Sequence, residues 1–489
     1  MSKYDYDVVV IGGGVAGFAA AGMAAGVGKR VLLIEKDRLG GSCNLYTCMP
    51  TKTLIRAGIV RDTLVSAEKF GLGFNPGSIT ADRVFPYVKK VIADVSELDT
   101  VESFREIGID IKFGSPEFLD NHRVLLDGHA ISGSKFIIAT GGRPAQIDID
   151  GYKEAPYLNN QTVFDLEKMP ASIIIIGGGP AGLEFASAFN LLGVKVTVVE
   201  LADAILIRED RELAVRLSKR LIEQGITVLT GHKSVKLAKV GQLTRLEVQD
   251  KAGATSILEA EAVLLTIGRQ PNIEGLNLDK AGVKYTGKGI SVNQRQKTSA
   301  DNIYACGDVT GIYQMAATSE QQALVAANNA VIPLLKQKAD YKHLIWVTFT
   351  EPPLAHAGLT EEEARARYGN SIRVYRYDYK SIRRAKMEQN DFGLAKFICT
   401  KNFKLVGVQI LGDRAEELAH EAQVVKVFGK PMHRLHFVPH AYPTYAESII
   451  KRIGDMAYLD WMSSNPFIRL GLKIMPGFRN NMAAIKSKL

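Results

Sequence analysis

Two cysteines and two glycine-rich turns are the residues whose types and spacing could do chemistry. Cys43 and Cys48 lie five positions apart in the stretch 40–52. No second Cys pair stands at ligand spacing, so a zinc site is not expected. The spacing favours a reversible dithiol–disulfide pair at a helix start, where the helix dipole lowers the pKa of a thiol. Cys306 and Cys399 have no partner by spacing, and we predict that both are core residues.

The first glycine-rich turn has the layout of a dinucleotide-binding unit. A predicted strand over residues 6–10 enters the turn, an alanine-rich helical segment follows, and a second strand over residues 31–35 ends in Glu35. Gly12 permits the tight turn, Gly14 lets a pyrophosphate approach the backbone, and Gly17 lets the helix pack closely on the strand. Free N–H groups at the helix start would bind phosphates. Glu35, 18 residues beyond Gly17, would accept hydrogen bonds from a ribose diol.

The same layout recurs in a second unit. An apolar strand over residues 172–176 is followed by Gly177, Gly179 and Gly182, and Glu200 stands 18 residues beyond the last of these. Two units with matched spacing predict two dinucleotides in one chain, which suggests electron transfer between them. A carboxylate at position 200 would accept a hydrogen bond from a ribose 2′-hydroxyl and repel a 2′-phosphate. The sequence therefore favours NADH over NADPH.

The remaining strand-like runs complete the expected architecture. A strand after each unit ends in a small-residue turn, at Thr140-Gly141 and at Gly268, and a further strand places Asp308 at its carboxyl end, where ligands gather in α/β sheets. From about Tyr341, strand-like runs with two helices predict an α+β module. We expect an α/β protein with two Rossmann-like domains and a C-terminal α+β domain. The predicted divisions are 1–150, 151–275, 276–342 (a segment contacting the first nucleotide), 343–457 and a basic extension, 458–489.

Composition excludes several classes of protein. Of the 489 residues, 46% are hydrophobic and only four are cysteines, so neither a disordered chain nor a disulfide-stapled scaffold is expected. No apolar run is long enough to span a membrane. The net charge is +9, but most of the basic residues are interleaved with acidic ones and no nucleic-acid-binding motif is present, so nucleic acid is not expected as a partner. Cytoplasm is the expected location, although the terminal Ser-Lys-Leu matches a peroxisomal address.

Taken in order, these motifs resemble the class I pyridine nucleotide-disulfide oxidoreductases, also called flavoprotein disulfide reductases. The pattern is similar to that of dihydrolipoyl dehydrogenase and of mercuric reductase-like members. The resemblance extends from about Asp5 to Asp455. It rests on both glycine motifs, the cysteine spacing, Ala139-Thr-Gly141, Gly268-Arg-Gln-Pro, Gly307-Asp308, Phe349-Thr-Glu-Pro and Gly358-Leu-Thr-Glu. It implies a homodimer that binds FAD in the first unit and NAD(P)H in the second, and whose C-terminal module forms the dimer interface.

The resemblance also implies roles for individual residues. Cys48 would lie nearer the flavin and Cys43 would exchange with the substrate. Lys52 would lie near flavin N5 and pair with Glu184, and Asp308 would bind the ribityl chain. No metal ligands are expected. The candidate cofactor-binding residues are Gly12, Gly14, Gly17, Glu35, Lys52, Thr140, Gly141, Asp308, Ala317, Gly177, Gly179, Gly182, Glu200 and Gly268.

The sequence departs from the family at the expected acid/base. Dithiol-reducing members have a His directly before Pro-Thr and a Glu that orients it, both supplied by the other subunit. Here Tyr442 occupies the His position and Glu447 is retained, while His440, two positions upstream, is a candidate to substitute as the base by a local shift. A phenol with a pKa near 10 donates hydrogen bonds but is a poor base near neutral pH. The redox loop also differs, with Leu45 and Thr47 where the family usually has Asn and Gly.

Three functions remain open at this stage. The first is an NADH-dependent reductase of a small-molecule or protein-bound disulfide, similar to dihydrolipoyl dehydrogenase. The second is a mercuric-reductase-like, metal or quinone reductase in which Tyr442 replaces the base. The third is a docking subunit of a multienzyme or membrane complex. The apolar and basic tail after Leu459 predicts either an interfacial membrane helix or packing on the dimer itself.

Overall fold

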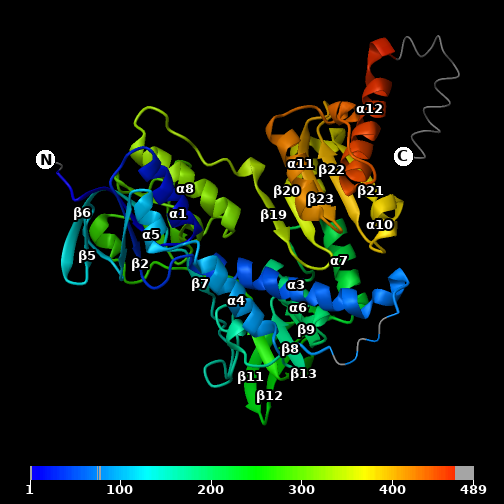
Figure 1. Ribbon diagram of the computed structural model, residues 1–489, viewed down its shortest axis with the longest axis horizontal. Helices are drawn as coiled ribbons and strands as arrows, with labels where there is room; N and C mark the ends of the chain where they lie inside the picture. The colour runs from blue at the N-terminus through cyan, green and yellow to red at the C-terminus, as the bar shows by residue number, and fades with distance from the viewer. Residues whose placement is uncertain (1–2, 74, 76, 78, 469–489) are drawn as a thin grey trace.

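Three large sheets organise the chain, and they lie at the left, at the bottom and at the upper right of Figure 1. The computed structural model describes residues 3–73, 75, 77 and 79–468. The left unit contains the first glycine-rich turn, the lower unit contains the second, and the C-terminal strands form the third. This confirms the predicted α/β class, with two Rossmann-like units and a C-terminal α+β module.

The first sheet is built on a central strand that is buried on both faces. β1 (Tyr6–Ile11) runs parallel to β2 (Val31–Glu35) on one side and β6 (His129–Ile138) on the other. The alternate side chains of β1 pack into different cores, one formed with α1 (Val15–Gly26) and α8 (Ala316–Val331) and the other with the segment after residue 275. Such double burial explains the unbroken apolar run of this strand. The other strands are β3 (Ile109–Phe113), β4 (Glu117–Asp120), β5 (Arg123–Leu126) and β18 (Ile303–Ala305), which pairs with β6.

One long helix links the first unit to the second. α3 (Cys48–Val65) begins beside the first sheet and packs against α6 (Pro180–Leu191) of the second unit (Figure 1). A Cβ added at Gly58 of α3 would lie 2.8 Å from the Cβ of Leu191, so the helices approach closely there. The remaining helices of this region are α2 (Gly41–Tyr46), α4 (Val84–Ser96) and α5 (Val101–Glu106).

The second unit is a smaller parallel sheet with an added antiparallel sheet. Its strand order is β10-β9-β8-β14, with α6 and α7 (Arg211–Glu223) packed against it. The parallel strands are β8 (Ser172–Ile176), β9 (Lys195–Glu200), β10 (Thr227–Thr230) and β14 (Ala262–Leu265). The antiparallel strands are β11 (Lys233–Val240), β12 (Leu243–Gln249) and β13 (Thr255–Ala260). The pair β7 (Gly142–Pro144) and β15 (Arg269–Pro271) joins this unit to the first, and β16 (Tyr285–Thr286) pairs with β17 (Gly289–Ile290).

The third unit is an antiparallel sheet in the order β19-β20-β23-β22-β21. Its strands are β19 (Ile345–Thr348), β20 (Leu354–Gly358), β21 (Arg373–Asp378), β22 (Leu394–Cys399) and β23 (Leu405–Leu411). Its α-helices are α9 (Glu361–Tyr368), α10 (Arg383–Met387), α11 (Ala415–Val427) and α12 (Arg452–Ser464). The prediction of two helices was therefore too low. α12 includes the start of the predicted tail, but 469–489, with the terminal Ser-Lys-Leu, lie outside the described residues.

A buried polar network joins the second and third units. The Lys396 Nζ on β22 lies 2.6 Å from Asp210 Oδ1, 2.7 Å from Glu212 Oε2 and 3.1 Å from Glu361 Oε2. Only 2% of the Lys396 side chain is exposed, so its charge is balanced by carboxylates rather than by water. Beside it, Glu209 accepts hydrogen bonds from the Trp346 indole at 2.6 Å and contacts the ring of His356 at 2.8 Å. The second and third units therefore share a polar core.

None of the helices in the part of the chain described above is long and apolar enough to cross a membrane.

Candidate active site

The first glycine-rich turn presents backbone N–H groups to a ligand and is fixed by Glu35. Gly12 has a φ of +111°, a conformation that side chains disfavour. The Glu35 Oε2 accepts a hydrogen bond from Gly13 N at 2.6 Å, which ties the end of β2 to the turn. A Cβ added at Gly17 would lie 1.8 Å from the Gly12 carbonyl oxygen, so α1 packs directly on the turn. Gly14 is the N-cap of α1, and no side chain caps the helix.

The second turn repeats this geometry in detail. Gly177 has a φ of +117°, and Glu200 Oε2 accepts a hydrogen bond from Gly178 N at 2.6 Å. A Cβ at Gly182 would lie 2.0 Å from the Gly177 carbonyl oxygen. Gly179 is the uncapped N-cap of α6. In both units no side chain caps the N-terminus of the helix. In both units, too, the helix lies so close to the glycine turn that a Cβ has no room at Gly17 or at Gly182. These two features fit the pyrophosphate groups of FAD and NAD(P)H.

One cavity of about 780 Å³ brings together eleven of the predicted site residues. It extends from the first glycine turn past the cysteines to the start of α6. The predicted residues that line it are Gly12, Gly14, Glu35, Cys43, Cys48, Lys52, Thr140, Gly141, Glu184, Gly268 and Asp308. The predicted residues that do not line it are Gly17, Gly177, Gly179, Gly182, Glu200, Ala317, His440, Tyr442 and Glu447. Ala317 itself does not line the cavity, whereas Met315, Ala316 and Ser319 of the same segment do.

The two cysteines form a disulfide at the junction of two helices. Cys43 belongs to α2, and Cys48 is the first residue of α3, with their Cα atoms 4.7 Å apart. A sulfur at the first position of an 18-residue helix lies at the positive end of its dipole, which stabilises a thiolate. Cys306 and Cys399 are buried, as predicted. Burial raises the pKa of the Cys306 thiol to about 12 and also raises that of Cys399, so both are inert.

Lys52 and Glu184 form an ion pair in the wall of the cavity. The Lys52 Nζ on α3 lies 2.6 Å from Glu184 Oε2 on α6. The other carboxylate oxygen, Oε1, accepts a hydrogen bond from Phe349 N at 3.0 Å. The ammonium also lies over the Phe349 ring, 4.7 Å from its centroid. The pair therefore joins the first unit, the second unit and the start of the third.

Arg269 is a site residue that sequence reasoning did not single out. Its Nε lies 2.7 Å from Asp308 Oδ2, and one of its terminal nitrogens donates to Ser42 Oγ at 3.0 Å and to the Gly142 carbonyl at 2.5 Å. Ser42 directly precedes Cys43 in the chain. The guanidinium thus connects the predicted ribityl-binding carboxylate with the redox loop. The motif Gly268-Arg-Gln-Pro was the only signal in the sequence that pointed to it.

The predicted acid/base residues lie in the third unit. The Tyr442 hydroxyl accepts a hydrogen bond from Arg383 at 3.1 Å, and the residue is 64% exposed. The His440 Nε2 lies 2.9 Å from Glu421 Oε1, and its side chain is only 8% exposed. Glu447 accepts a hydrogen bond from the Ser448 hydroxyl at 3.2 Å. Tyr442 is therefore the member of this group that presents its side chain to the outside of the subunit.

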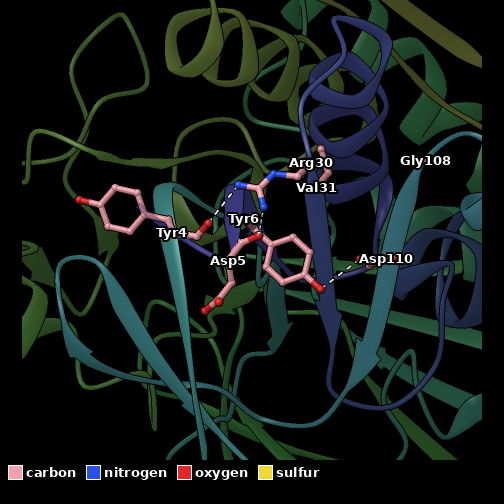
Figure 2. Close-up of a pocket in the computed structure, with 7 residues that line it drawn as sticks. All are labelled: Tyr4, Asp5, Tyr6, Arg30, Val31, Gly108 and Asp110. Carbon is pink, nitrogen blue, oxygen red and sulfur yellow. Dashed lines mark hydrogen bonds between the residues drawn. The ribbon is translucent and has the colours of Figure 1, made fainter. Parts of the chain in front are cut away.

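A second cavity, of about 560 Å³, lies on the opposite edge of the first sheet (Figure 2). It is lined at the amino ends of β1, β2 and β3, whereas the glycine turn follows the carboxyl end of β1. Figure 2 shows the Tyr6 hydroxyl directed at Asp110, 3.0 Å away, and the Arg30 guanidinium directed at the backbone of Tyr4 and Asp5. Its polar groups bind one another, and it contains none of the predicted site residues.

The family of the chain follows from comparison with known proteins. Residues 6–323 match the family model of the pyridine nucleotide-disulphide oxidoreductases, and residues 345–453 match the dimerisation domain of the same family. The chain belongs to this family. Its members are FAD-dependent NAD(P)H:disulfide oxidoreductases, and the dimerisation domain supports a homodimer. The glycine turns, the disulfide and the common cavity fit this chemistry.

Individual relatives are similar over most of their length. A dihydrolipoyl dehydrogenase of Bacillus subtilis (strain 168) is 31% identical over 455 residues, which cover 90% of this chain and 96% of the relative. A mercuric reductase of Staphylococcus aureus is 31% identical over 449 residues, covering 91% and 81%. Among solved structures, the HOCl-induced flavoprotein disulfide reductase RclA from Escherichia coli superposes with a TM-score of 0.81 at 28% identity, covering 93% of this chain and 100% of that one.

Proposed function

We propose that this protein uses NADH to reduce a disulfide substrate through the Cys43–Cys48 pair. The observation that carries the proposal is the single cavity in which the disulfide lies between the first glycine turn and the start of α6. FAD bound at the first turn would supply the transfer of electrons from the nicotinamide to the disulfide. The protein's own contribution is to place the dinucleotides on either side of the cavity and to hold the thiols ready for exchange.

Several charged groups are placed to serve the cofactors. Lys52 would hold a positive charge beside the flavin, and its ion pair with Glu184 fixes where that charge lies. Asp308 would bind the ribityl hydroxyls while Arg269 keeps its carboxylate in position. Glu35 would accept from the FAD ribose, since only part of its acceptor capacity is used by Gly13 and the backbone N–H of residue 37.

The preference for NADH follows from Glu200. Its two oxygens accept hydrogen bonds from Gly178 N at 2.6 Å and Ala202 N at 2.7 Å, so the carboxylate is fixed at the end of β9. An oriented carboxylate there accepts from a 2′-hydroxyl and repels a 2′-phosphate. The nearby Lys251 is paired with Asp203, so its charge is already compensated.

Thiol–disulfide exchange completes the proposed reaction. Transfer of two electrons from NADH converts the Cys43–Cys48 disulfide into one thiol and one thiolate and releases NAD⁺. Cys43 then attacks the substrate disulfide, and Cys48 resolves the mixed disulfide, so that one NADH and one proton yield two substrate thiols. Tyr442, brought in by the second copy of the chain, would donate a hydrogen bond to the leaving sulfur, with Arg383 holding the phenol oxygen.

The experiment is an anaerobic NADH titration of the purified yellow protein, followed by visible absorbance. We expect a long-wavelength band after two electrons, because the Cys48 thiolate would then lie against oxidised flavin. Direct bleaching of the flavin without this band would overturn the proposal, since the cysteines would not be accepting electrons. With lipoamide as the first substrate, Tyr442→Phe should lower turnover at least tenfold. His440→Asn tests the other predicted acid/base residue and should leave turnover unchanged.

A second candidate function is the reduction of metal ions or quinones. It is favoured by Tyr442, a poor base, at the position where dithiol-reducing members have His. Mercuric reductases are among the relatives, and a Cu(II) complex of RclA is among the similar solved structures. Turnover of Cu(II), Hg(II) or a quinone in the absence of any disulfide, with no turnover of lipoamide, would establish it. A membrane, peroxisomal or docking role of the tail depends on residues outside those described and is not part of the proposal.

A further inference from the structure

The hydroxyl group of Thr47 lies between two acceptors in the redox loop. Thr47 separates α2 from α3 and directly precedes Cys48. Its Oγ1 donates a hydrogen bond to the Ser42 carbonyl at 2.8 Å and lies 3.8 Å from Cys48 Sγ. A hydroxyl carries one hydrogen, so the bond to Ser42 leaves a lone pair facing the sulfur. The same hydroxyl can therefore serve either acceptor, but only one at a time.

The redox state of Cys48 decides which acceptor is stronger. In the disulfide the sulfur is neutral and a weak acceptor, so the carbonyl of Ser42 holds the hydrogen. After reduction by two electrons, Cys48 carries a negative charge, and hydrogen bonds to charged acceptors are roughly twice as strong as neutral ones. Rotation about the Cβ–Oγ bond is enough to redirect the hydrogen, because the oxygen is already within 4 Å of the sulfur.

We propose that Thr47 is a redox-responsive hydrogen-bond donor, which turns from the Ser42 carbonyl to the Cys48 thiolate when the disulfide is reduced. The inference rests on the proposed function, in which the pair cycles between disulfide and dithiol. Reduction by NADH gives the Cys43 thiol, the Cys48 thiolate and NAD⁺. The Thr47 bond favours the thiolate over its protonated form and so keeps Cys48 charged between reduction and exchange.

The surroundings explain why an uncharged donor matters at this position. The nearby cations are already paired, Lys52 with Glu184 at 2.6 Å and Arg269 with Asp308 at 2.7 Å. These four groups, on α3, α6, β15 and the turn after β18, line the cavity together with the cysteines and with Tyr46 on α2. The other titratable residues of the cavity wall are Glu35, Lys36, Asp37, Arg38, Glu117, Arg143 and Glu274, and Asp99 accepts a hydrogen bond from Asn44 of α2. Since each pair is close to neutral overall, the positive end of α3 and the Thr47 hydroxyl remain to stabilise the thiolate.

Ser42 supplies the acceptor of the Thr47 hydroxyl in the disulfide form. Its hydroxyl oxygen accepts a hydrogen bond from Arg269 at 3.0 Å, and Arg269 is itself fixed by Asp308. The Ser42 residue, whose carbonyl accepts from Thr47, is therefore held through its side chain by Arg269 of β15, which also lines the cavity. The hydroxyl returns to this carbonyl when the disulfide forms again, so the loop needs no backbone movement.

The test measures the pKa of Cys48 in a Cys43→Ser background, in which the disulfide cannot form. Two readouts follow the thiolate against pH: the long-wavelength absorbance of the FAD-loaded protein, and the iodoacetamide alkylation rate of Cys48 determined by mass spectrometry. Adding Thr47→Val, which is nearly isosteric but lacks the hydroxyl, should raise the pKa of Cys48 by about one pH unit, a tenfold fall in the ratio of thiolate to thiol. Thr47→Ser should restore the original pKa.

Thr53→Val is the matched control. Thr53 lies on the same helix, and its hydroxyl donates to the Met49 carbonyl at 2.8 Å without contact to either sulfur. An unchanged pKa in Thr47→Val, or an equal rise in Thr53→Val, would overturn the role of Thr47. A Cys43→Ser protein that binds FAD but shows no long-wavelength band at any pH would instead overturn the proposed contact of Cys48 with flavin. The alkylation profile would still decide the role of Thr47, so the two failures are distinguishable.

Discussion

Substitution of Gly17 by Ala should weaken FAD binding at least tenfold, because of a close contact that the structure shows between α1 and the first glycine turn. The added Cβ would lie 1.8 Å from the Gly12 carbonyl oxygen, whereas real Cβ atoms essentially never approach within 3.0 Å, so α1 and the turn must separate by about 1.2 Å (3.0 − 1.8). The obstacle is backbone, so no side chain can move aside. Overpacking of this kind costs about 1–3 kcal/mol. It also displaces the N–H groups of α1 from the phosphates.

The assay is the FAD content of the purified protein, taken from the ratio of visible to ultraviolet absorbance, together with its melting temperature. We expect at least a tenfold loss of FAD in Gly17→Ala. The control is Gly22→Ala in the same helix, where an added Cβ meets nothing within 4 Å. This change should keep FAD fully bound and stabilise the helix by up to about 1 kcal/mol.

The second unit supplies an internal comparison. Gly182→Ala places a Cβ 2.0 Å from the Gly177 carbonyl and should weaken NADH binding at least tenfold while FAD remains bound. Equal FAD content in Gly17→Ala and Gly22→Ala would refute the reasoning, since the close approach would then have no consequence for the nucleotide. Loss of FAD in Gly182→Ala would show that the two turns do not act on separate nucleotides.

Two further predictions concern charged groups. Glu184→Gln removes the partner of the partly exposed Lys52 and should lower the free energy of unfolding by about 1–2 kcal/mol, measured in urea; an unchanged urea midpoint would contradict this. Lys396→Met removes the only ion-pair partner that the described residues give the buried Asp210, whereas Glu212 and Glu361 keep Arg376, and it should cost about 3–5 kcal/mol by the same measurement. Burial disfavours the charged forms of Glu212 and Glu361 and by itself would raise their pKa values. Hydrogen bonds outweigh this effect, so both pKa values are lowered in the folded protein. Glu212 accepts these bonds from Lys396 and Arg376, and Glu361 accepts them from Arg365 and Lys396. The two carboxylates therefore contribute fully to the free energy of unfolding above their ordinary pKa of 4.5, and this contribution is lost as the pH falls through their lowered pKa values. Unfolding measured between pH 7 and pH 3 should show a smaller decrease in the free energy of unfolding for Lys396→Met than for the original protein.

The sequence was most informative where strands are buried and bounded by glycine. The strands 31–35 and 172–176 were predicted with the bounds that the structure gives, because both are unbroken apolar runs that end at a turn or a charge. The fingerprints also placed Glu35 and Glu200 correctly at strand ends. Local patterns of this kind carry their own signal, because the residues that make the contact lie close together in the chain.

The short helices of the third unit gave no such signal. α9 has one buried residue, Ala364, so it lacks the apolar period from which helices are predicted. Its capping box, formed by Thr360 and Glu363, was the feature that could have revealed it. Arg269 was missed for another reason, because its contacts with Ser42 and Asp308 join residues that are distant in sequence.

The polar core between the second and third units has a consequence for how the protein folds. Asp210, from the second unit, and Lys396, from the third, are each at most 3% exposed and balance each other's charge. If the third unit unfolded alone, the buried Asp210 would lose its cation, and if the second unit unfolded alone, Lys396 would keep only Glu361 of its three carboxylates. We therefore expect the two units to melt as one cooperative block although each has its own sheet. In calorimetry this block should appear as a single transition.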